Sequence, residues 1–166
     1  MRAFIAIDVP EDLMSFARDF EEPGVKILDN YHMTLKFFGE ISEREIEGLI
    51  VKLKKIKVPE FHLHIADLGV FPSEEVINVA WVGLVDSGFL CELIKQVGLI
   101  CGDEKNFKPH VTFARVKSLK NKKSFLEKIK KTQVSGTFEV KSFRLYESVL
   151  KLGKAEHKLI KEFKLV

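Results

Sequence analysis

The sequence predicts an α+β fold in which two lobes, each built of a sheet and helices, face each other across a central cleft. Three observations predict it. About eight segments have the composition of β-strands, at least four have the apolar spacing of helices, and the two kinds alternate along the chain. The pattern His-x-Thr occurs twice, each time within a strand-like segment. The two halves therefore have similar layouts, and each is expected to give one motif strand to the cleft.

The composition is that of a globular protein, and residues 1–166 are expected to form one domain of two interleaved lobes. The net charge of +3 permits an anionic partner but does not require nucleic acid. No apolar run approaches the ~20 residues of a membrane span, and the first apolar run is too short for a signal peptide. Cys91 and Cys101 fit reduced, buried thiols. We expect a cytoplasmic protein that acts as a monomer.

Strands and helices alternate in the first half with clear boundaries. Pro10 opens a helix, because proline fits the first turn and the acidic residues behind it suit the positive end of the helix dipole. Ser42 and Glu45 form the capping-box pattern of a second helix, whose apolar stripe reaches Ile56. The expected strands are Ala3 to Ile7, Val25 to Leu28, Tyr31 to Phe38 and Phe61 to Ile65, with turn signals at Gly69 and Pro72.

The second half repeats this alternation. A helix is expected from Ser87 to Cys101, and Asn106 to Pro109 should be extended because proline disfavours helix in the residue before it. A basic helix is expected from Ser124 to Lys131. The expected strands are Val76 to Val85, His110 to Val116, one long or two bent strands within Val134 to Leu150, and Glu156 to Leu165 after a turn at Gly153.

The two His-x-Thr motifs provide the catalytic candidates His32, Thr34, His110 and Thr112. Side chains two residues apart on a strand point to the same face, so each histidine should emerge beside its threonine. With five histidines and four threonines, chance placement gives only ~0.1 copies of the motif. Imidazole can act as acid or base near neutral pH, and hydroxyls can donate to phosphate oxygens. The motifs therefore predict acid–base chemistry on a phosphate without a metal or cofactor.

Five stretches, in this order, resemble one known family: residues 1–8, 32–40, 69–73, 109–116 and 145–148. They are similar to the 2H phosphoesterase superfamily, and more narrowly to the LigT-like RNA 2′,3′-cyclic phosphodiesterases, also called 2′–5′ RNA ligases. The resemblance implies a bilobal LigT-like fold and hydrolysis of RNA 2′,3′-cyclic phosphate ends to 2′-phosphates, with reversible 2′–5′ ligation. It implies His32 as the acid and His110 as the base, which the residues alone leave open. It also implies RNA ends, such as those of tRNA halves, as partners.

Four further residues are candidates for substrate binding. Arg115 resembles the arginine that follows the second motif in the family and could grip a phosphate. Lys36 is expected on the same strand face as His32 and Thr34. Phe37 is a candidate for stacking on a base, and Tyr146 is a candidate for lining the cleft. The His62-x-His64 pair lacks a third ligand at metal spacing, so no metal site is predicted.

Two other functions remain open on the sequence. A related enzyme could act on a small cyclic nucleotide such as ADP-ribose 1″,2″-cyclic phosphate, because the motifs do not separate this substrate from RNA. A non-catalytic RNA-binding module could use aromatic side chains on a sheet together with lysines. The chain lacks the aromatic signature of RRM domains, and a binding module has no need for paired His-x-Thr motifs.

Overall fold

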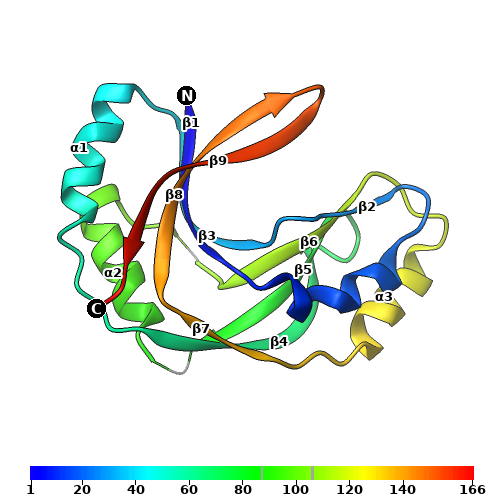
Figure 1. Cartoon of the computed structure of the whole chain (residues 1–166). Coiled ribbons are helices and arrows are strands. Elements are labelled where there is room, and N and C mark those ends of the chain that lie inside the picture. Colours follow the sequence, from blue (N-terminus) through cyan, green and yellow to red (C-terminus); the bar gives the residue numbers. More distant parts are fainter. Residues whose placement is uncertain (87, 106) are drawn as a thin grey trace.

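The computed structural model describes residues 1–86, 88–105 and 107–166 and confirms the mixed α+β class (Figure 1). Ser87 and Asn106, where the sequence places the start of a helix and of an extended segment, lie outside the described residues. In chain order, the elements are β1 (Arg2–Asp8), η1 (Glu11–Phe20), β2 (Val25–Ile27), β3 (His32–Glu40), α1 (Glu43–Leu53), β4 (Phe61–Pro72), β5 (Ile77–Asp86), α2 (Leu90–Cys101), β6 (His110–Val116), α3 (Lys122–Lys131), β7 (Thr137–Val140), β8 (Ser142–Lys151) and β9 (Lys154–Lys164).

The strands form two antiparallel sheets that share a common plan. The first sheet has the strand order β3-β1-β8-β9, and the second has the order β2-β6-β5-β4-β7. Apart from the edge strand β2, the second order matches the first strand by strand, with β6 in the place of β3 and β5 in the place of β1. The two motif strands therefore occupy equivalent positions. Each sheet contains strands from both halves of the chain, since β4 lies in the second sheet and β8 and β9 lie in the first.

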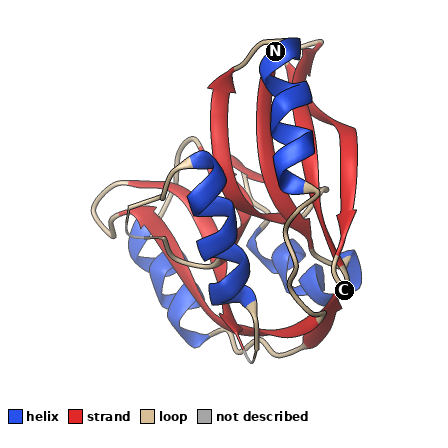
Figure 2. Ribbon diagram, turned by 90° about the vertical axis from the view of Figure 1, so that its left-hand side faces the viewer, coloured by secondary structure: helices blue, strands red, loops and turns tan. Residues whose placement is uncertain are grey.

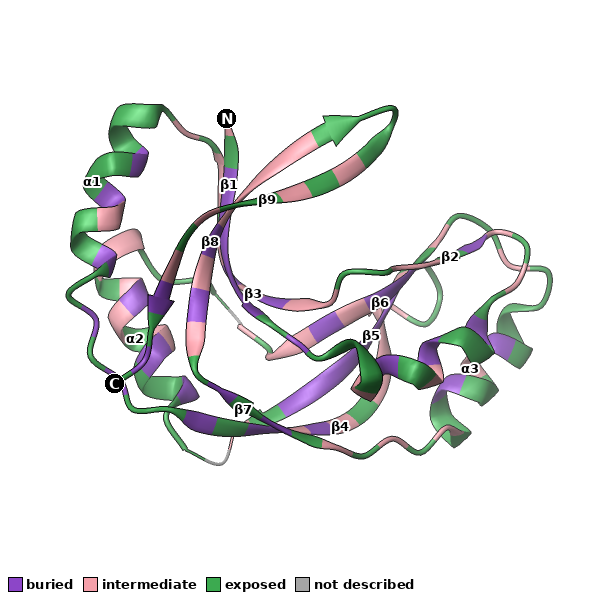
Figure 3. Ribbon diagram, in the orientation of Figure 1, coloured by how far each residue is buried: buried purple, intermediate pink, exposed green. Residues whose placement is uncertain are grey.

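The helices cover the outer faces of the two sheets and leave the inner faces open to each other (Figures 1 and 2). On the first sheet, α2 packs against β3 and α1 packs against α2. On the second sheet, η1 contacts β2 and β6, and α3 contacts β4. Figure 3 shows buried residues along the helices and strands where these layers meet. The sheets and helices together form one apolar core, in which Ile5, Met33, Leu63 and Phe113 are almost fully buried.

Local signals explain most of the helix boundaries. The capping box of α1 is present, with Ser42 accepting from the Glu45 backbone and Glu45 accepting from the Ser42 backbone. The α3 helix begins at Lys122, two residues earlier than predicted, because the Asn121 side chain caps it. The first predicted helix is a 3₁₀ helix, interrupted by non-helical dihedrals at Met14.

Two further predictions were wrong. The β4 strand does not end near Ile65 but continues through Gly69, which lies within the strand rather than in a turn. A side chain at Gly69 would collide with the Trp81 ring, so glycine is needed there to seat the indole. Cys91 is exposed rather than buried, because it lies on α2 between the inward-facing Leu90 and Leu93.

Among the described residues, no helix combines the length and the apolar character required to cross a bilayer.

Candidate active site

A β-bulge in β3 determines which side chains reach the space between the sheets. Thr34 pairs with Ala6 of β1, but Lys36 pairs with Ile5, so Leu35 has no partner in the ladder. A bulged residue breaks the simple alternation of faces. Consequently Phe37, three residues after Thr34, lies on the same side as Thr34 and His32.

The bulge places Lys36 away from the cleft, contrary to the prediction that it shares the face of His32 and Thr34. The Lys36 ammonium instead forms an ion pair of 3.0 Å with Glu104, beyond the end of α2. The side chain is only 17% exposed and is not part of the cleft wall. Its pairing indicates a structural role for Lys36.

The second motif strand contains the same irregularity at the equivalent place. Thr112 pairs with Trp81 of β5, whereas Ala114 pairs with Ala80, so Phe113 is the extra residue. Arg115, three residues after Thr112, therefore returns to the cleft side. Each motif strand thus directs three side chains into the space between the sheets. They are the histidine, the threonine and, beyond the bulged residue, Phe37 in β3 or Arg115 in β6.

These six side chains line one cleft between the two sheets. The cleft has a volume of about 460 Å³, within the range of small-molecule sites. His32, Thr34 and Phe37 enter it from the first sheet, and His110, Thr112 and Arg115 enter it from the second. The structure thus brings together both motif pairs and two of the four predicted binding residues.

The His110 ring is fixed by a hydrogen bond and by aromatic neighbours. Its Nδ1 atom lies 2.7 Å from the Lys108 carbonyl oxygen, which can only accept, so Nδ1 carries a proton. The ring meets Phe71 edge-on at 5.2 Å, and the ammonium of Lys108 lies 4.0 Å from the centre of the Trp81 ring. In the neutral imidazole this leaves the lone pair on Nε2.

His32 is held differently, by aromatic packing on the first sheet. Its ring stacks on Phe4 at 5.2 Å between centroids, and the His157 ring meets it at 4.7 Å and 73°. Burial, followed by the proximity of His157, lowers the pKa of His32 to about 4, and Asp8 opposes this only in part. His32 is therefore neutral near pH 7 in the free protein.

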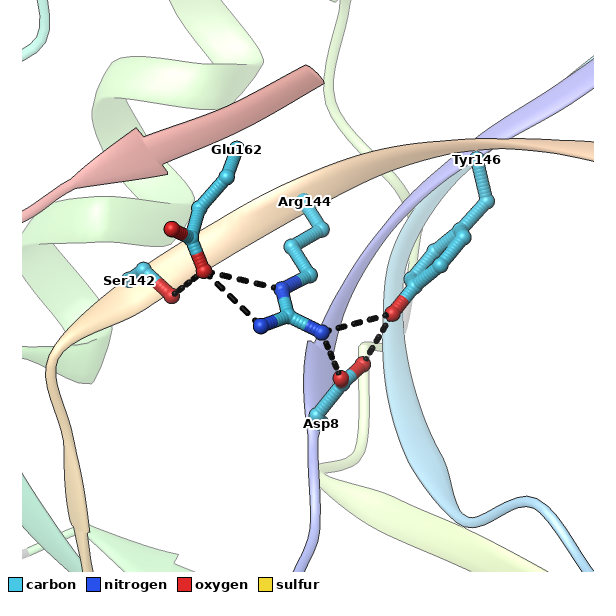
Figure 4. Close-up of polar contacts among 5 residues, drawn as sticks. All are labelled: Asp8, Ser142, Arg144, Tyr146 and Glu162. Carbon is cyan, nitrogen blue, oxygen red and sulfur yellow. Dashed lines mark hydrogen bonds and ion pairs between the residues drawn. The ribbon is translucent and has the colours of Figure 1, made fainter. Parts of the chain in front are cut away.

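Five side chains of the first sheet form a polar network (Figure 4), and its Asp8 lies next to His32. Asp8 is the cross-strand partner of His32. Its carboxylate accepts from Arg144 at 2.5 Å and from the Tyr146 hydroxyl at 2.6 Å. The Glu162 carboxylate accepts a hydrogen bond of 2.8 Å from the other terminal nitrogen of the Arg144 guanidinium. It also accepts a hydrogen bond from the Ser142 hydroxyl. The network fixes Asp8 beside His32.

Tyr146 lies beside the main cleft rather than in its wall. It lines a smaller adjoining pocket of about 230 Å³, which shares His32 and His157 with the main cleft. Its hydroxyl is engaged by Asp8, and burial raises the pKa of the phenol. Tyr146 is therefore placed to support the site through Asp8.

Two of the cleft-lining side chains that the sequence did not predict bear directly on the chemistry of the site. Lys26 of β2 is the cross-strand partner of Arg115 and adds a second cation to the same wall. His157 of β9 lies in the cleft although no motif surrounds it. Only the sheet order, which places β9 beside β8 and near β1, could have revealed it.

The His62-x-His64 pair forms no metal centre in the part of the chain that the structure describes. No group of three potential ligands from His, Cys, Asp and Glu is present among the described residues. The Nδ1 atom of His64 lies 2.8 Å from the Thr137 hydroxyl. That contact joins β4 to β7 and fits a role in the sheet.

Two imidazoles and two threonine hydroxyls, brought to one cleft by equivalent strands, define a phosphoesterase of the two-histidine class. Comparison with known proteins agrees with this class. The family described as LigT like Phosphoesterase matches residues 5–81. A relative from Methanocaldococcus jannaschii, named RNA 2′,3′-cyclic phosphodiesterase, is 33% identical over 98% of this chain and 100% of its own length. The chain therefore belongs to the LigT-like phosphoesterase family.

Further relatives show the same likeness over nearly the whole chain. An Aquifex aeolicus protein of the same name is 32% identical, with 99% of this chain and 97% of the relative covered. The crystal structure of E. coli LigT complexed with 3′-AMP superposes with a TM-score of 0.79 at 25% identity, covering 99% of this chain and 97% of LigT. The predicted bilobal LigT-like fold is confirmed.

Proposed function

We propose that this protein hydrolyses the 2′,3′-cyclic phosphate at RNA ends to a 2′-phosphate. The observation that carries the proposal is the cleft in which both His-x-Thr motifs meet. Relatives that match almost the whole chain bear the name RNA 2′,3′-cyclic phosphodiesterase. The site residues named below, and their roles, are part of the proposal.

The reaction needs one base and one acid on opposite sides of the phosphorus. His110 fits the base, because its Nδ1–H is directed at the Lys108 carbonyl and its Nε2 lone pair can take a proton from water. The water oxygen bonds to phosphorus, the bond from phosphorus to the ribose 3′ oxygen breaks, and the 2′ ester bond remains. His32 donates the proton that the departing 3′ oxygen needs.

His32 must gain a proton before it can act as the acid. Its lowered pKa keeps the imidazole neutral in the free protein. A phosphodiester anion in the cleft favours the imidazolium form, since a nearby opposite charge stabilises the charged state of an acid–base group. Substrate binding and proton uptake by His32 are therefore coupled. The imidazolium form of His32, which acts as the acid, is present mainly in the complex of the protein with its substrate.

The remaining cleft residues supply charge and orientation. Thr34 and Thr112 can donate hydrogen bonds to the non-bridging phosphate oxygens, where negative charge grows in the transition state. Arg115 and Lys26 neutralise the anion from the second sheet. Phe37, which is 52% exposed and stacked on Phe4, offers an aromatic face to the terminal base.

The same geometry accounts for 2′–5′ ligation, which differs from hydrolysis only in the attacking oxygen. If an RNA 5′-hydroxyl takes the place of water, His110 deprotonates it and the product is a 2′–5′ linkage. No step requires a metal ion. The substrates we propose are RNA ends with cyclic phosphates, such as those of tRNA halves. We also propose that the protein acts in the cytoplasm. We propose that it acts as a monomer, since the residues that line the cleft all come from one chain.

A substrate panel tests this proposal against the two alternatives. The purified protein would be incubated with an oligonucleotide ending in a 2′,3′-cyclic phosphate, and separately with ADP-ribose 1″,2″-cyclic phosphate. We expect kcat/KM to be higher on the oligonucleotide, with a 2′-phosphate product. Faster turnover of the ADP-ribose derivative would assign the protein to small cyclic nucleotides. Oligonucleotide that is bound but unchanged would indicate a binding module.

A further inference from the structure

His157 is a third histidine of the cleft, and no step of the proposed reaction uses it. It lies on β9, opposite Ser148 of β8 in the sheet, and both residues line the main cleft. It also lines the smaller pocket, as His32 does. The two histidines thus stand together at the junction of the two pockets.

Three rings pack against one another at this junction. The centroids of Phe4 and His32 are 5.2 Å apart, those of Phe4 and His157 are 4.9 Å apart, and those of His32 and His157 are 4.7 Å apart. Phe4 is fully buried and stacks beneath His32, whereas His157 meets both rings edge-on at 73°. Phe4 and His157 therefore border two sides of the His32 ring.

The two motif histidines differ in what orients them. His110 is fixed by its hydrogen bond to the Lys108 carbonyl. Within the described ranges, no protein group forms a hydrogen bond with either His32 or His157, and the contacts of the His32 ring are aromatic. A catalytic imidazole must be held close to its productive geometry for efficient proton transfer. At His32 this orientation must come from ring packing.

We propose that His157 is a positioning residue, whose edge-on ring holds the His32 imidazole in its catalytic orientation. The proposal rests on the proposed function, because it assigns His32 a proton-transfer role. His157 acts on catalysis through His32 and not through the phosphate. The β8–β9 hairpin is therefore part of the active site of the first lobe, since it carries this ring.

The charged and titratable groups around the pair come from three strands and one loop. Asp8 of β1 favours protonation of both rings. Asp29, between β2 and β3, favours protonation of His157, whereas Arg115 of β6 opposes it. Tyr146 of β8 lies 6.3 Å from His32 and 6.2 Å from His157 between centroids. Burial lowers the pKa of both histidines, and each His157 variant should alter the protonation of His32.

Two substitutions separate ring packing from other roles. His157→Ala removes the ring, and we expect kcat on the cyclic-phosphate oligonucleotide to fall about 10- to 100-fold, with KM changed less than about threefold. His157→Phe retains an edge-on ring without nitrogen atoms, and we expect kcat within about threefold of wild type. Lys158→Ala is the matched control, because Lys158 is the exposed neighbour on β9 and lines neither pocket.

The imidazole signals of His32 give a readout that does not depend on turnover. In NMR titrations of the free protein, we expect the midpoint of His32 to rise from wild type to His157→Phe, and further in His157→Ala as water reaches the ring. Wild-type kcat in His157→Ala, or an unchanged His32 midpoint in both variants, would overturn the proposal. Equal loss of activity in His157→Phe and His157→Ala would also overturn it. If wild type left RNA unchanged, the proposed function would fail, and the titration would still decide whether His157 acts on His32.

Discussion

Phe37 and Arg115 occupy equivalent positions on the two motif strands, each three residues after a motif threonine, and in each strand one of the two residues in between is bulged. The bulged residues are Leu35 in β3 and Phe113 in β6. One lobe therefore presents an aromatic ring where the other presents a guanidinium, and both side chains line the cleft. In the proposed reaction, Phe37 would therefore contact the terminal base, and Arg115 would contact the phosphate from the opposite lobe.

Arg115→Ala should lower kcat/KM on the cyclic-phosphate oligonucleotide about 10- to 100-fold. A charge-assisted hydrogen bond contributes roughly 1.5–3 kcal/mol, and Arg115 forms no ion pair with a carboxylate of the described chain. Steady-state kinetics and the inhibition constant of inorganic phosphate would measure the effect. Arg115→Lys should recover part of the loss. Unchanged phosphate inhibition in Arg115→Ala would show that the guanidinium does not contact the anion.

Phe37→Ala should raise KM for an oligonucleotide about 10-fold, because stacking of a base on an aromatic ring contributes roughly 1–3 kcal/mol. Phe37→Trp should retain the wild-type KM. The inhibition constant of inorganic phosphate, which has no base, should be the same in all three proteins. An equal loss of phosphate affinity in Phe37→Ala would instead indicate a general disturbance of the cleft.

Lys26 and Lys36 form a matched pair for testing which lysine serves the cleft. Lys26 lies opposite Arg115 in the sheet and lines the cleft, whereas Lys36 is paired with Glu104. Lys26→Met should raise KM several-fold and weaken the salt dependence of KM, since one phosphate contact is lost. Lys36→Met should leave both quantities near wild type. A larger effect of Lys36→Met than of Lys26→Met on KM would place Lys36 in the site and contradict the orientation that the bulge at Leu35 gives it.

The motif histidines could be predicted from the sequence, whereas Lys36 could not be placed correctly. The histidine and the threonine of each motif are only two positions apart, a distance over which the alternation of a strand holds, and so the cleft side of Thr34 and Thr112 was predictable. The position of Lys36 depended on the same alternation, which the bulge at Leu35 breaks. Nothing in the local composition marks that bulge. Arg115 was proposed only because of the family resemblance, since strict alternation would have turned it away.

His157 illustrates a second limit of sequence reasoning. Its partners Phe4 and His32 lie near the start of the chain, and only the sheet order β3-β1-β8-β9 brings β9 toward them. The sequence predicted the strand of His157 but not the neighbours of that strand. Contacts between distant segments depend on topology, which periodicity and capping signals do not encode.

Acid should destabilise the fold through His32. Its pKa is lowered to about 4 in the folded protein, whereas an unfolded histidine has a pKa near 6.5. The unfolded chain therefore binds more protons between these values, and stability falls as the pH decreases through this window. The lowered pKa of His157 acts in the same direction.

Urea unfolding of wild type and His32→Gln would measure this effect. Between pH 7.5 and pH 4.5, wild type should lose about 2–3 kcal/mol more free energy of unfolding than the variant. Carboxylates titrate in both proteins, so their contribution cancels in the difference. Equal losses in the two proteins would show that His32 keeps an ordinary pKa in the fold.

In the proposed reaction, one histidine from each lobe takes part in opening the cyclic phosphate. The most direct measurement is the chemical identity of the RNA end after incubation of wild type, His32→Ala and His110→Ala with a cyclic-phosphate oligonucleotide in EDTA. We predict a 2′-phosphate from wild type and a rate at least about 100-fold lower in each variant. A cyclic end left intact by wild type, or a variant as active as wild type, would contradict the claim.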